Sequence, residues 1–145
     1  MTSPATASTT GLATDLRHAT MRLARRLRQE RAADDLSDPQ FTVLAYLVRE
    51  GAASPNGLAA WEHVSPPSMN RTINGLEEKQ LVTRSPSSDD GRRVLVEATE
   101  AGRSVVEETR RRRDAWLDDQ LGVLDENDIA ALRRSVEILG QMMHS

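Results

Sequence analysis

Two short stretches of the sequence carry polar side chains of the kinds that recognise nucleic acid. The first is SPPSMNRT, which runs from Ser65 to Thr72, and the second is DDGRR, residues 89–93. Asn and Arg side chains can hydrogen-bond to base edges in a DNA groove, and Arg also forms forked contacts with phosphate. Ser hydroxyls are frequent partners of the DNA backbone. The chemistry that these stretches offer is therefore recognition of a duplex.

The composition argues against catalysis and metal binding. None of the 145 residues is Cys, which excludes a thiol nucleophile, a disulfide framework and thiolate metal ligands. The three histidines, His18, His63 and His144, are far apart in the sequence. There is no Gly-rich phosphate loop and no nucleophile-elbow motif. We therefore expect no enzyme activity, no cofactor and no metal site.

The overall charge does not favour a nucleic-acid partner. The net charge is -3 and the isoelectric point is about 5.6. Over residues 61–97, five basic side chains stand against six acidic ones, so this region is not a basic patch. Binding to DNA would therefore have to depend on local geometry and on the avidity of a dimer.

The length of the chain predicts one domain with a short extension. Residues 1–11 are mostly Ser, Thr, Ala and Pro without periodicity, which predicts a disordered tail before a single domain over 12–145. The first residues lack the basic start and apolar core of a signal peptide, and no apolar run approaches a membrane span. We expect a cytoplasmic protein with no membrane partner.

The elements that must position the two polar stretches are a pair of helices and a hairpin. Hydrophobic periodicity and capping residues predict helices and short strands in a fixed order. The helices cover about 12–32, 37–49, 54–62, 65–79, 99–121 and 125–143, and the strands cover 81–85 and 93–97, joined by PSSDDG. This order predicts a mainly α fold with a small β-hairpin wing, that is, a winged helix-turn-helix.

The flanking helices carry apolar seams that one small domain cannot cover. In the last helix the apolar residues follow a 3-4-3-4 spacing typical of a coiled-coil seam. They are Ile129, Leu132, Val136, Leu139 and Met143. We therefore expect a DNA-binding lobe over about 37–98 and a homodimer formed through dimerisation helices over about 12–33 and 99–143.

The helix over 65–79 is the predicted recognition helix. A helical wheel places Met69, Ile73 and Leu76 toward the core. Pro67, Asn70, Arg71, Asn74 and Glu78 fall on the opposite side, with Ser68 at its flank. Because prolines occupy the first turn, we expect the helix N-terminus to keep free donors for a phosphate. The alternative is an ordinary solvated face, but the helix-turn-helix and hairpin context favours groove binding.

The hairpin is the predicted wing. Arg92 and Arg93 lie just past its turn, where a guanidinium can enter a minor groove. Asp89 or Asp90 could pair with Arg92 and hold its direction. The alternative is a solvent-exposed hairpin whose charges protect a strand edge from aggregation.

Three stretches of the chain are similar to the MarR family of bacterial transcriptional regulators. They are LSDPQFTVLAYL (36–47), GLAAWEHVSPPSMNRTINGLEEKQLVTR (57–84) and DDGRRVLVEATEAGR (89–103), and with the helix order the resemblance covers about 12–143. It implies that Arg92 enters the minor groove, that the helix over 65–79 enters the major groove and that the terminal helices form a dimer. The candidate DNA contacts are Ser65, Pro67, Ser68, Asn70, Arg71, Asn74, Arg84, Asp90, Arg92 and Arg93.

The chain departs from the family pattern after the recognition helix. The family usually has Gly in a Glu-Lys-Gly-Leu run, where this chain has Gln80. A left-handed backbone costs a non-glycine residue about 1 kcal/mol. We therefore expect this helix end to have a different shape.

The resemblance also implies a ligand, because small and often aromatic anions release many family members from DNA. In this sequence, Arg113 falls within the apolar arc of the helix over 99–121. A guanidinium there needs a carboxylate across the dimer, an acidic ligand, or a route for its head group to water. The candidate ligand-binding residues are His18, Tyr46, Arg113 and Trp116.

The favoured function is a homodimeric repressor that binds double-stranded DNA at a pseudo-palindromic operator and is released by a small aromatic or anionic effector. One alternative is a winged-helix protein-interaction module with weak or no DNA binding, which the near-neutral charge of residues 61–97 favours. Another is a dimer that binds a small molecule and has no DNA function.

Overall fold

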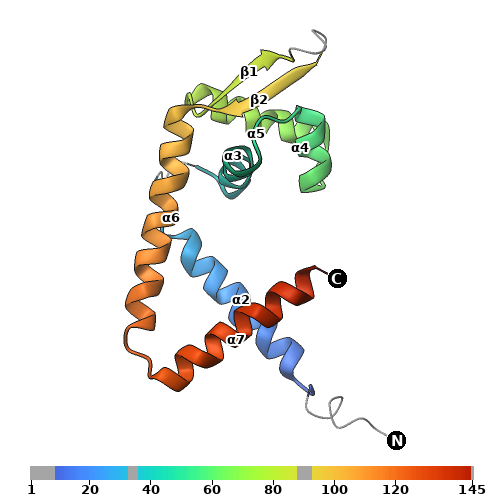
Figure 1. Cartoon of the computed structure of the whole chain (residues 1–145). Helices are drawn as coiled ribbons and strands as arrows, with labels where there is room; N and C mark the ends of the chain where they lie inside the picture. The colour runs from blue at the N-terminus through green and yellow to red at the C-terminus, as the bar shows by residue number, and fades with distance from the viewer. Residues whose placement is uncertain (1–8, 33–35, 88–92, 145) are drawn as a thin grey trace, which may run out of the picture.

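The computed structural model describes residues 9–32, 36–87 and 93–144 and confirms the order of elements predicted from the sequence. Its helices and strands, in chain order, are α2 (Leu12–Arg28), α3 (Asp38–Glu50), α4 (Pro55–Glu62), α5 (Pro66–Glu78), β1 (Val82–Pro86), β2 (Val94–Ala98), α6 (Glu100–Leu121) and α7 (Glu126–Met143). Both strands begin one residue later than predicted. The molecule is mainly helical with one β-hairpin (Figure 1).

Capping side chains start five of the helices where the sequence predicted a start. In each case a Ser, Thr or Asp side chain accepts a hydrogen bond from the backbone N–H three residues later, which stabilises a helix by about 1 kcal/mol. The caps are Ser37, Ser54, Ser65, Thr99 and Asp125. At α3 the side chain of Gln40 also accepts from the Ser37 N–H, which completes a capping box.

The hydrophobic core lies where α3, α4, α5 and the hairpin meet. Leu44 of α3, Leu58 of α4 and Ile73 of α5 are fully buried there. The hairpin closes this core because Val82 and Val96 point into it. Strands β1 and β2 pair antiparallel from Val82 opposite Ala98 to Pro86 opposite Val94. Burial of the core fixes α4 and α5 relative to the hairpin.

The end of α5 corrects one expectation from the sequence. Gln80 adopts a left-handed backbone with φ 62°, and the Leu81 N–H donates to the Leu76 carbonyl while the Gln80 N–H donates to the Glu77 carbonyl. These two bonds form a Schellman motif, the usual ending at a glycine. The helix end therefore keeps the shape that glycine would give. The reason is that the motif and the burial of Leu81 offset a backbone cost of about 1 kcal/mol.

Helix α6 runs from the hairpin away from this core and leads into α7 (Figure 1). In the view of Figure 1, α2 and α7 cross below the core. Neither α2 nor α7 contains a buried residue. Their large exposed apolar side chains include Leu12, Met21, Leu23, Leu132, Val136, Ile138, Met142 and Met143. In the part of the chain that the structure describes, no helix is both long and apolar enough to cross a membrane.

Candidate nucleic-acid interface

The outward face of α5 is polar, as the helical wheel predicted. Asn70, Arg71 and Asn74 are exposed along one side of the helix, and Pro67 is exposed in its first turn. On the opposite side Met69, Ile73 and Leu76 are buried. Helix α4 and strand β1 both pack against α5, while the polar residues of α5 stay exposed, so the polar face lies on the outside of the core. This face can enter a groove as a rigid unit.

The N-terminus of α5 offers fewer donors than the sequence suggested. Of the first four backbone positions, Pro66 and Pro67 have no N–H, and the N–H of Ser68 donates to Ser65 Oγ at 3.2 Å. Only the N–H of Ser65 is left for a phosphate. The expectation of a set of free donors is therefore wrong, because the serine cap and the prolines remove three of the four. A phosphate here would instead meet the hydroxyls of Ser65 and Ser68.

Arg84 does not point away from the protein but lies across the outer flank of α5. Its Nη1 donates to Asn74 Oδ1 at 2.7 Å and to Glu77 Oε1 at 3.0 Å, and its Nη2 donates to Asn70 Oδ1 at 3.4 Å. We call Arg84, Asn70, Asn74 and Glu77 the Arg84 cluster. It joins β1 to the outward face of α5 through side chains alone. The sequence named three of these residues as separate DNA contacts and did not indicate that they bind one another.

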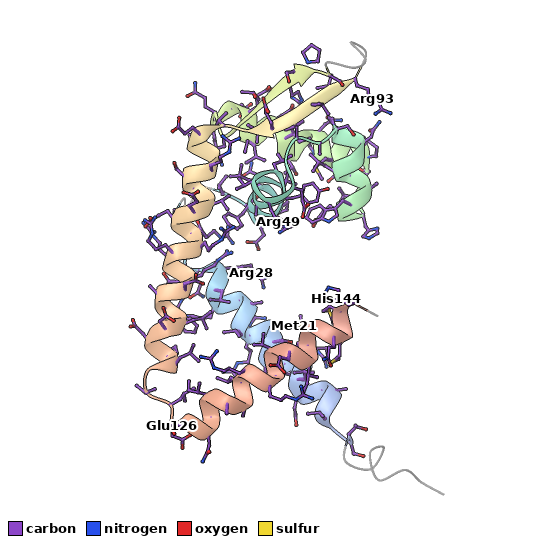
Figure 2. The ribbon with its side chains drawn as sticks, in the orientation of Figure 1. Met21, Arg28, Arg49, Arg93, Glu126 and His144 are labelled. Atoms are coloured by element: carbon purple, nitrogen blue, oxygen red, sulfur yellow. The ribbon has the colours of Figure 1, made fainter. Side chains whose placement is uncertain are left out.

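Two other arginines at this surface are free to bind an external anion. Among the residues that the structure describes, Arg71 and Arg93 have no ion pair and no side-chain hydrogen bond. Arg71 is exposed on α5, and Arg93 is exposed at the turn end of the wing, just before β2 (Figure 2). Asp90 and Arg92, which the sequence places at the wing tip, lie outside the described residues.

The four candidate ligand residues lie in different places. Tyr46 packs against Trp61, with ring centroids 4.3 Å apart. Trp116 lies under the guanidinium of Arg26, 4.5 Å from the ring centroid. His18 is exposed on α2. Trp116 and Arg113 are one turn apart on α6, whereas no contact among the described residues joins His18 or Tyr46 to Arg113.

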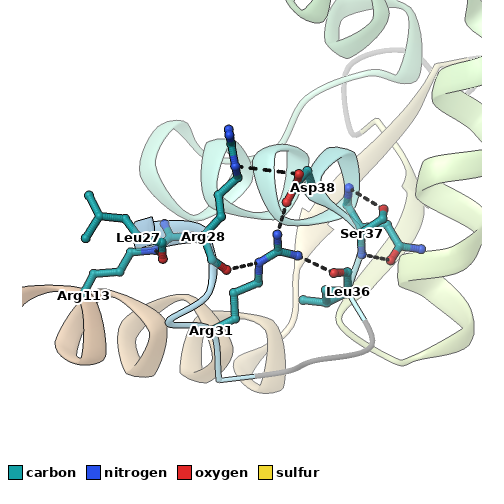
Figure 3. A network of polar contacts seen from close by, with 8 residues as sticks. Leu27, Arg28, Arg31, Leu36, Ser37, Asp38 and Arg113 are labelled. Atoms are coloured by element: carbon teal, nitrogen blue, oxygen red, sulfur yellow. Dashed lines mark hydrogen bonds and ion pairs between the residues drawn. The ribbon is translucent and has the colours of Figure 1, made fainter. Parts of the chain in front are cut away.

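Arg113 finds its partners within the protein. Its Nε donates to the carbonyl of Leu27 at 2.9 Å (Figure 3). Its guanidinium also lies over the ring of Phe41, at 4.7 Å from the centroid. Burial lowers the pKa of Arg113 from its ordinary value, and the nearby positive charges of Arg31 and Arg28 lower it further. Within one chain, the partners of Arg113 are thus a carbonyl and an aromatic face.

A network of arginines joins α2 to the beginning of α3. Arg31 donates to the carbonyls of Arg28 and Leu36 and forms an ion pair with Asp38 (Figure 3). A cavity of about 390 Å³ lies beside this network, between α2, α3, α4 and α6. Its lining residues are Arg28, Asp38, Phe41, Thr42, Ala45, Arg49, Trp61 and Arg113. Sequence reasoning identified only Arg113 among them as a site residue, because the cavity forms only where α3 packs against three other helices.

The arrangement of α4, α5 and the hairpin defines the class of this protein. A short helix, a turn, a second helix with a polar outer face and a two-stranded wing form a winged helix-turn-helix, a DNA-binding fold. The sequence of the chain agrees with this class, since the model of the MarR family matches residues 36–94.

Individual relatives support the same assignment. The chain is 40% identical over 128 residues to an uncharacterized HTH-type transcriptional regulator of Mycobacterium bovis, across 88% of this chain and 90% of that protein. Its fold matches that of a MarR family protein from Bacillus stearothermophilus with a TM-score of 0.82, at 22% identity and with both chains covered completely. It also matches FabT of Streptococcus pneumoniae, solved in complex with DNA, with a TM-score of 0.72 at 19% identity over 92% of this chain and 97% of that one. The chain belongs to the MarR family of transcriptional regulators, and it is a regulator and not an enzyme.

Proposed function

We propose that this regulator is a homodimeric repressor that binds a pseudo-palindromic operator, with one winged helix-turn-helix on each half-site. Helix α5 enters the major groove through Ser65, Pro67, Ser68, Asn70, Arg71 and Asn74, and the wing contacts the backbone and minor groove through Asp90, Arg92 and Arg93. Repression follows from steric block of a promoter that overlaps the operator.

The observation that carries this proposal is the exposed polar face of α5 on a buried scaffold. Met69, Ile73 and Leu76 anchor the helix, so Arg71 and the two asparagines are presented on a fixed frame. Such a helix fits the major groove, where Arg and Asn discriminate base edges. A protein of the same fold solved in complex with DNA adds support.

The proposed dimer rests on apolar surface that one chain leaves uncovered. A groove of about 990 Å³ lies between α2, the end of α6 and α7. It is lined mainly by Leu23, Trp116, Leu117, Leu121, Val123, Leu124, Ile129, Leu132 and Val136. Exposed apolar patches of this kind favour burial against a partner, and a second copy of the chain presents the same surface.

Selection of binding sites from random DNA with the purified protein tests this proposal. A specific regulator enriches a pseudo-palindrome whose half-sites lie about one helical turn, roughly 10 base pairs, apart. Transcription from a promoter that contains the enriched site then falls when the protein is added. No enrichment at any salt concentration would favour the alternative, a winged-helix module that contacts proteins.

We further propose that a small aromatic anion releases the protein from DNA by binding the cavity beside the arginine network. Three guanidinium groups, those of Arg28, Arg49 and Arg113, line this cavity together with the rings of Phe41 and Trp61. Because burial, and then the neighbouring positive charges of Arg31 and Arg28, lower the pKa of Arg113, an added carboxylate would stabilise its charged form.

Benzoate serves as the test ligand for this effector site. We expect benzoate to weaken DNA binding of the wild type, whereas benzyl alcohol, which has the same ring without the charge, has no effect. Arg113→Gln should lose the response to benzoate while it still binds DNA. Equal effects of benzoate on the wild type and on the variant would contradict this site.

A further inference from the structure

The Arg84 cluster connects the wing to the side chains that face the DNA. Arg84 stands in β1, opposite Val96 of β2, and its side chain is only 25% exposed although it lies at the molecular surface. Its guanidinium donates hydrogen bonds to three side chains of α5: Asn70, Asn74 and Glu77. These residues are spaced four and three positions apart in the sequence. Such spacings place the three on one stripe of the helix.

The chemistry of the guanidinium decides how the asparagines are turned. A guanidinium has only N–H donors and no acceptor. Each asparagine must therefore direct its carbonyl oxygen toward Arg84, because its NH₂ group could not bond there. The NH₂ group lies on the other arm of the planar amide and is left to donate elsewhere. The contact to Asn74, at 2.7 Å, is the shorter of the two and constrains its amide more.

An asparagine held in this way has a different base preference from a free one. A free asparagine recognises adenine with both groups, since its NH₂ donates to N7 while its oxygen accepts from N6. The oxygen keeps a second lone pair, but its bond to Arg84 turns it toward β1, so the NH₂ group is the arm left to reach a base and the favourable contact is a donation. Guanine offers N7 and O6 as acceptors in the major groove, and thymine offers O4.

We propose that Arg84 is a positioning residue that sets the base preference of Asn74, and to a lesser degree of Asn70, without itself contacting DNA. It holds their amides as donors and so favours guanine or thymine over adenine at the base that Asn74 meets. Glu77 completes the cluster, because its carboxylate pairs with Arg84 and keeps the guanidinium on the helix and away from phosphate. This inference rests on the proposed entry of α5 into the major groove.

Base preferences of Arg84 variants test the inference. Arg84→Met keeps the aliphatic stem and removes every donor. Starting from the enriched palindrome, all four bases are compared at each half-site position with wild type, Arg84→Met, Arg84→Lys and Asn74→Ala. The position contacted by Asn74 is the one whose preference disappears in Asn74→Ala. There we expect Arg84→Met to shift the preference toward adenine by about tenfold, the range of one forked base contact.

Control measurements separate positioning from direct contact. Arg84→Lys, which keeps one charged donor, should give an intermediate preference. Arg111→Met removes a comparable surface arginine, one paired with Glu108 on α6, and should leave every preference unchanged. The slope of affinity against salt concentration should be the same for Arg84→Met and wild type, because no phosphate contact is removed.

Two results would overturn the inference. If Arg84→Met weakens binding equally at all sequences and makes the salt dependence shallower, Arg84 is a phosphate contact. If the preferences do not change at all, the cluster has no role in recognition.

If the wild type enriches no palindrome, the proposed function fails, and the cluster is then tested in the free protein. There Arg84→Met, and not Arg111→Met, should shift the NMR resonances of the Asn70 and Asn74 side-chain amides, and unshifted resonances would contradict the cluster.

Discussion

At the scale of single residues, some arginines of the binding surface are available to contact DNA and others are already paired within the protein. Arg71 is exposed on α5 with no ion pair, while Arg84 on the neighbouring strand is bonded to three side chains. The ion pair between Arg84 and Glu77 removes one charge of each sign, so the net charge of this region stays unfavourable and binding depends on the arginines that remain available. Available charges placed on a rigid helix can bind DNA even where the total charge is unfavourable.

Arg71→Ala is expected to weaken operator binding by about 1–3 kcal/mol and to relax discrimination at one position in each half-site, as removal of a base-contacting arginine does. Fluorescence anisotropy with labelled operator DNA measures both effects. Arg111→Ala, which removes an exposed arginine from α6, is the matched control and should bind like the wild type. Unchanged affinity and specificity in Arg71→Ala would remove this residue from the interface.

The sequence predicted which residues α5 exposes but not how they are engaged. Exposure of Asn70 and Asn74 follows from a period of 3.6 residues, which is a local property of the chain. The bond from Arg84 to Asn74 depends on how β1 packs against α5, which is tertiary geometry without a sequence pattern. The same holds for the cavity beside Arg113, because its lining comes from four helices.

At the scale of elements, hydrogen bonds at the junction between the hairpin and α6 fix the wing relative to that helix. The Thr99 hydroxyl donates to the Gln80 carbonyl at 2.7 Å, and the Thr99 N–H donates to the Leu81 carbonyl at 2.9 Å. Gly102 lies directly against this junction, where an added Cβ would be 2.3 Å from the Leu81 carbonyl oxygen. The close approach requires glycine at this position of α6.

Gly102→Ala is expected to destabilise the fold by about 1–3 kcal/mol, because the methyl group must displace backbone atoms. Chemical denaturation followed by circular dichroism measures the free energy of unfolding. Ser104→Ala, at an exposed position of the same helix, is the control and should be at least as stable as the wild type, since alanine favours a helix. A Gly102→Ala protein as stable as the wild type would show that the junction yields without strain.

The elements themselves were largely predictable, and their ends less so. Capping residues marked the starts of α3, α5 and α6 correctly, since a cap acts within four residues. The strands were displaced by one residue, because strand ends depend on pairing across the hairpin. The left-handed Gln80 could not be predicted, since only the packed core makes it favourable.

At the scale of the whole molecule, one chain leaves a large apolar surface exposed on its terminal helices. Helices α2 and α7 have no buried residue, and Val136 and Val123 are 70% and 84% exposed. A dimer through these helices would cover the apolar groove and fix the separation of the two copies of α5. Spacing between the recognition helices is what converts two weak half-site contacts into one specific complex.

Val136→Asp is expected to weaken the dimer at least about tenfold, because each copy would bury an unpaired carboxylate. Sedimentation at micromolar concentration measures the association, and circular dichroism checks that the DNA-binding lobe stays folded. Gln141→Asp introduces the same charge on the side of α7 opposite the seam and should remain dimeric. Equal association of the two variants would place the dimer contact elsewhere.

The central claim is that two copies of α5 contact two half-sites at a fixed separation. It is tested most directly by comparing the enriched palindrome with one in which five base pairs are inserted between the half-sites. The insertion turns one half-site to the opposite face of the duplex while every base contact remains available. We expect the affinity to fall toward non-specific binding, by about a thousandfold at physiological salt. Equal affinity for the two DNAs would contradict the account.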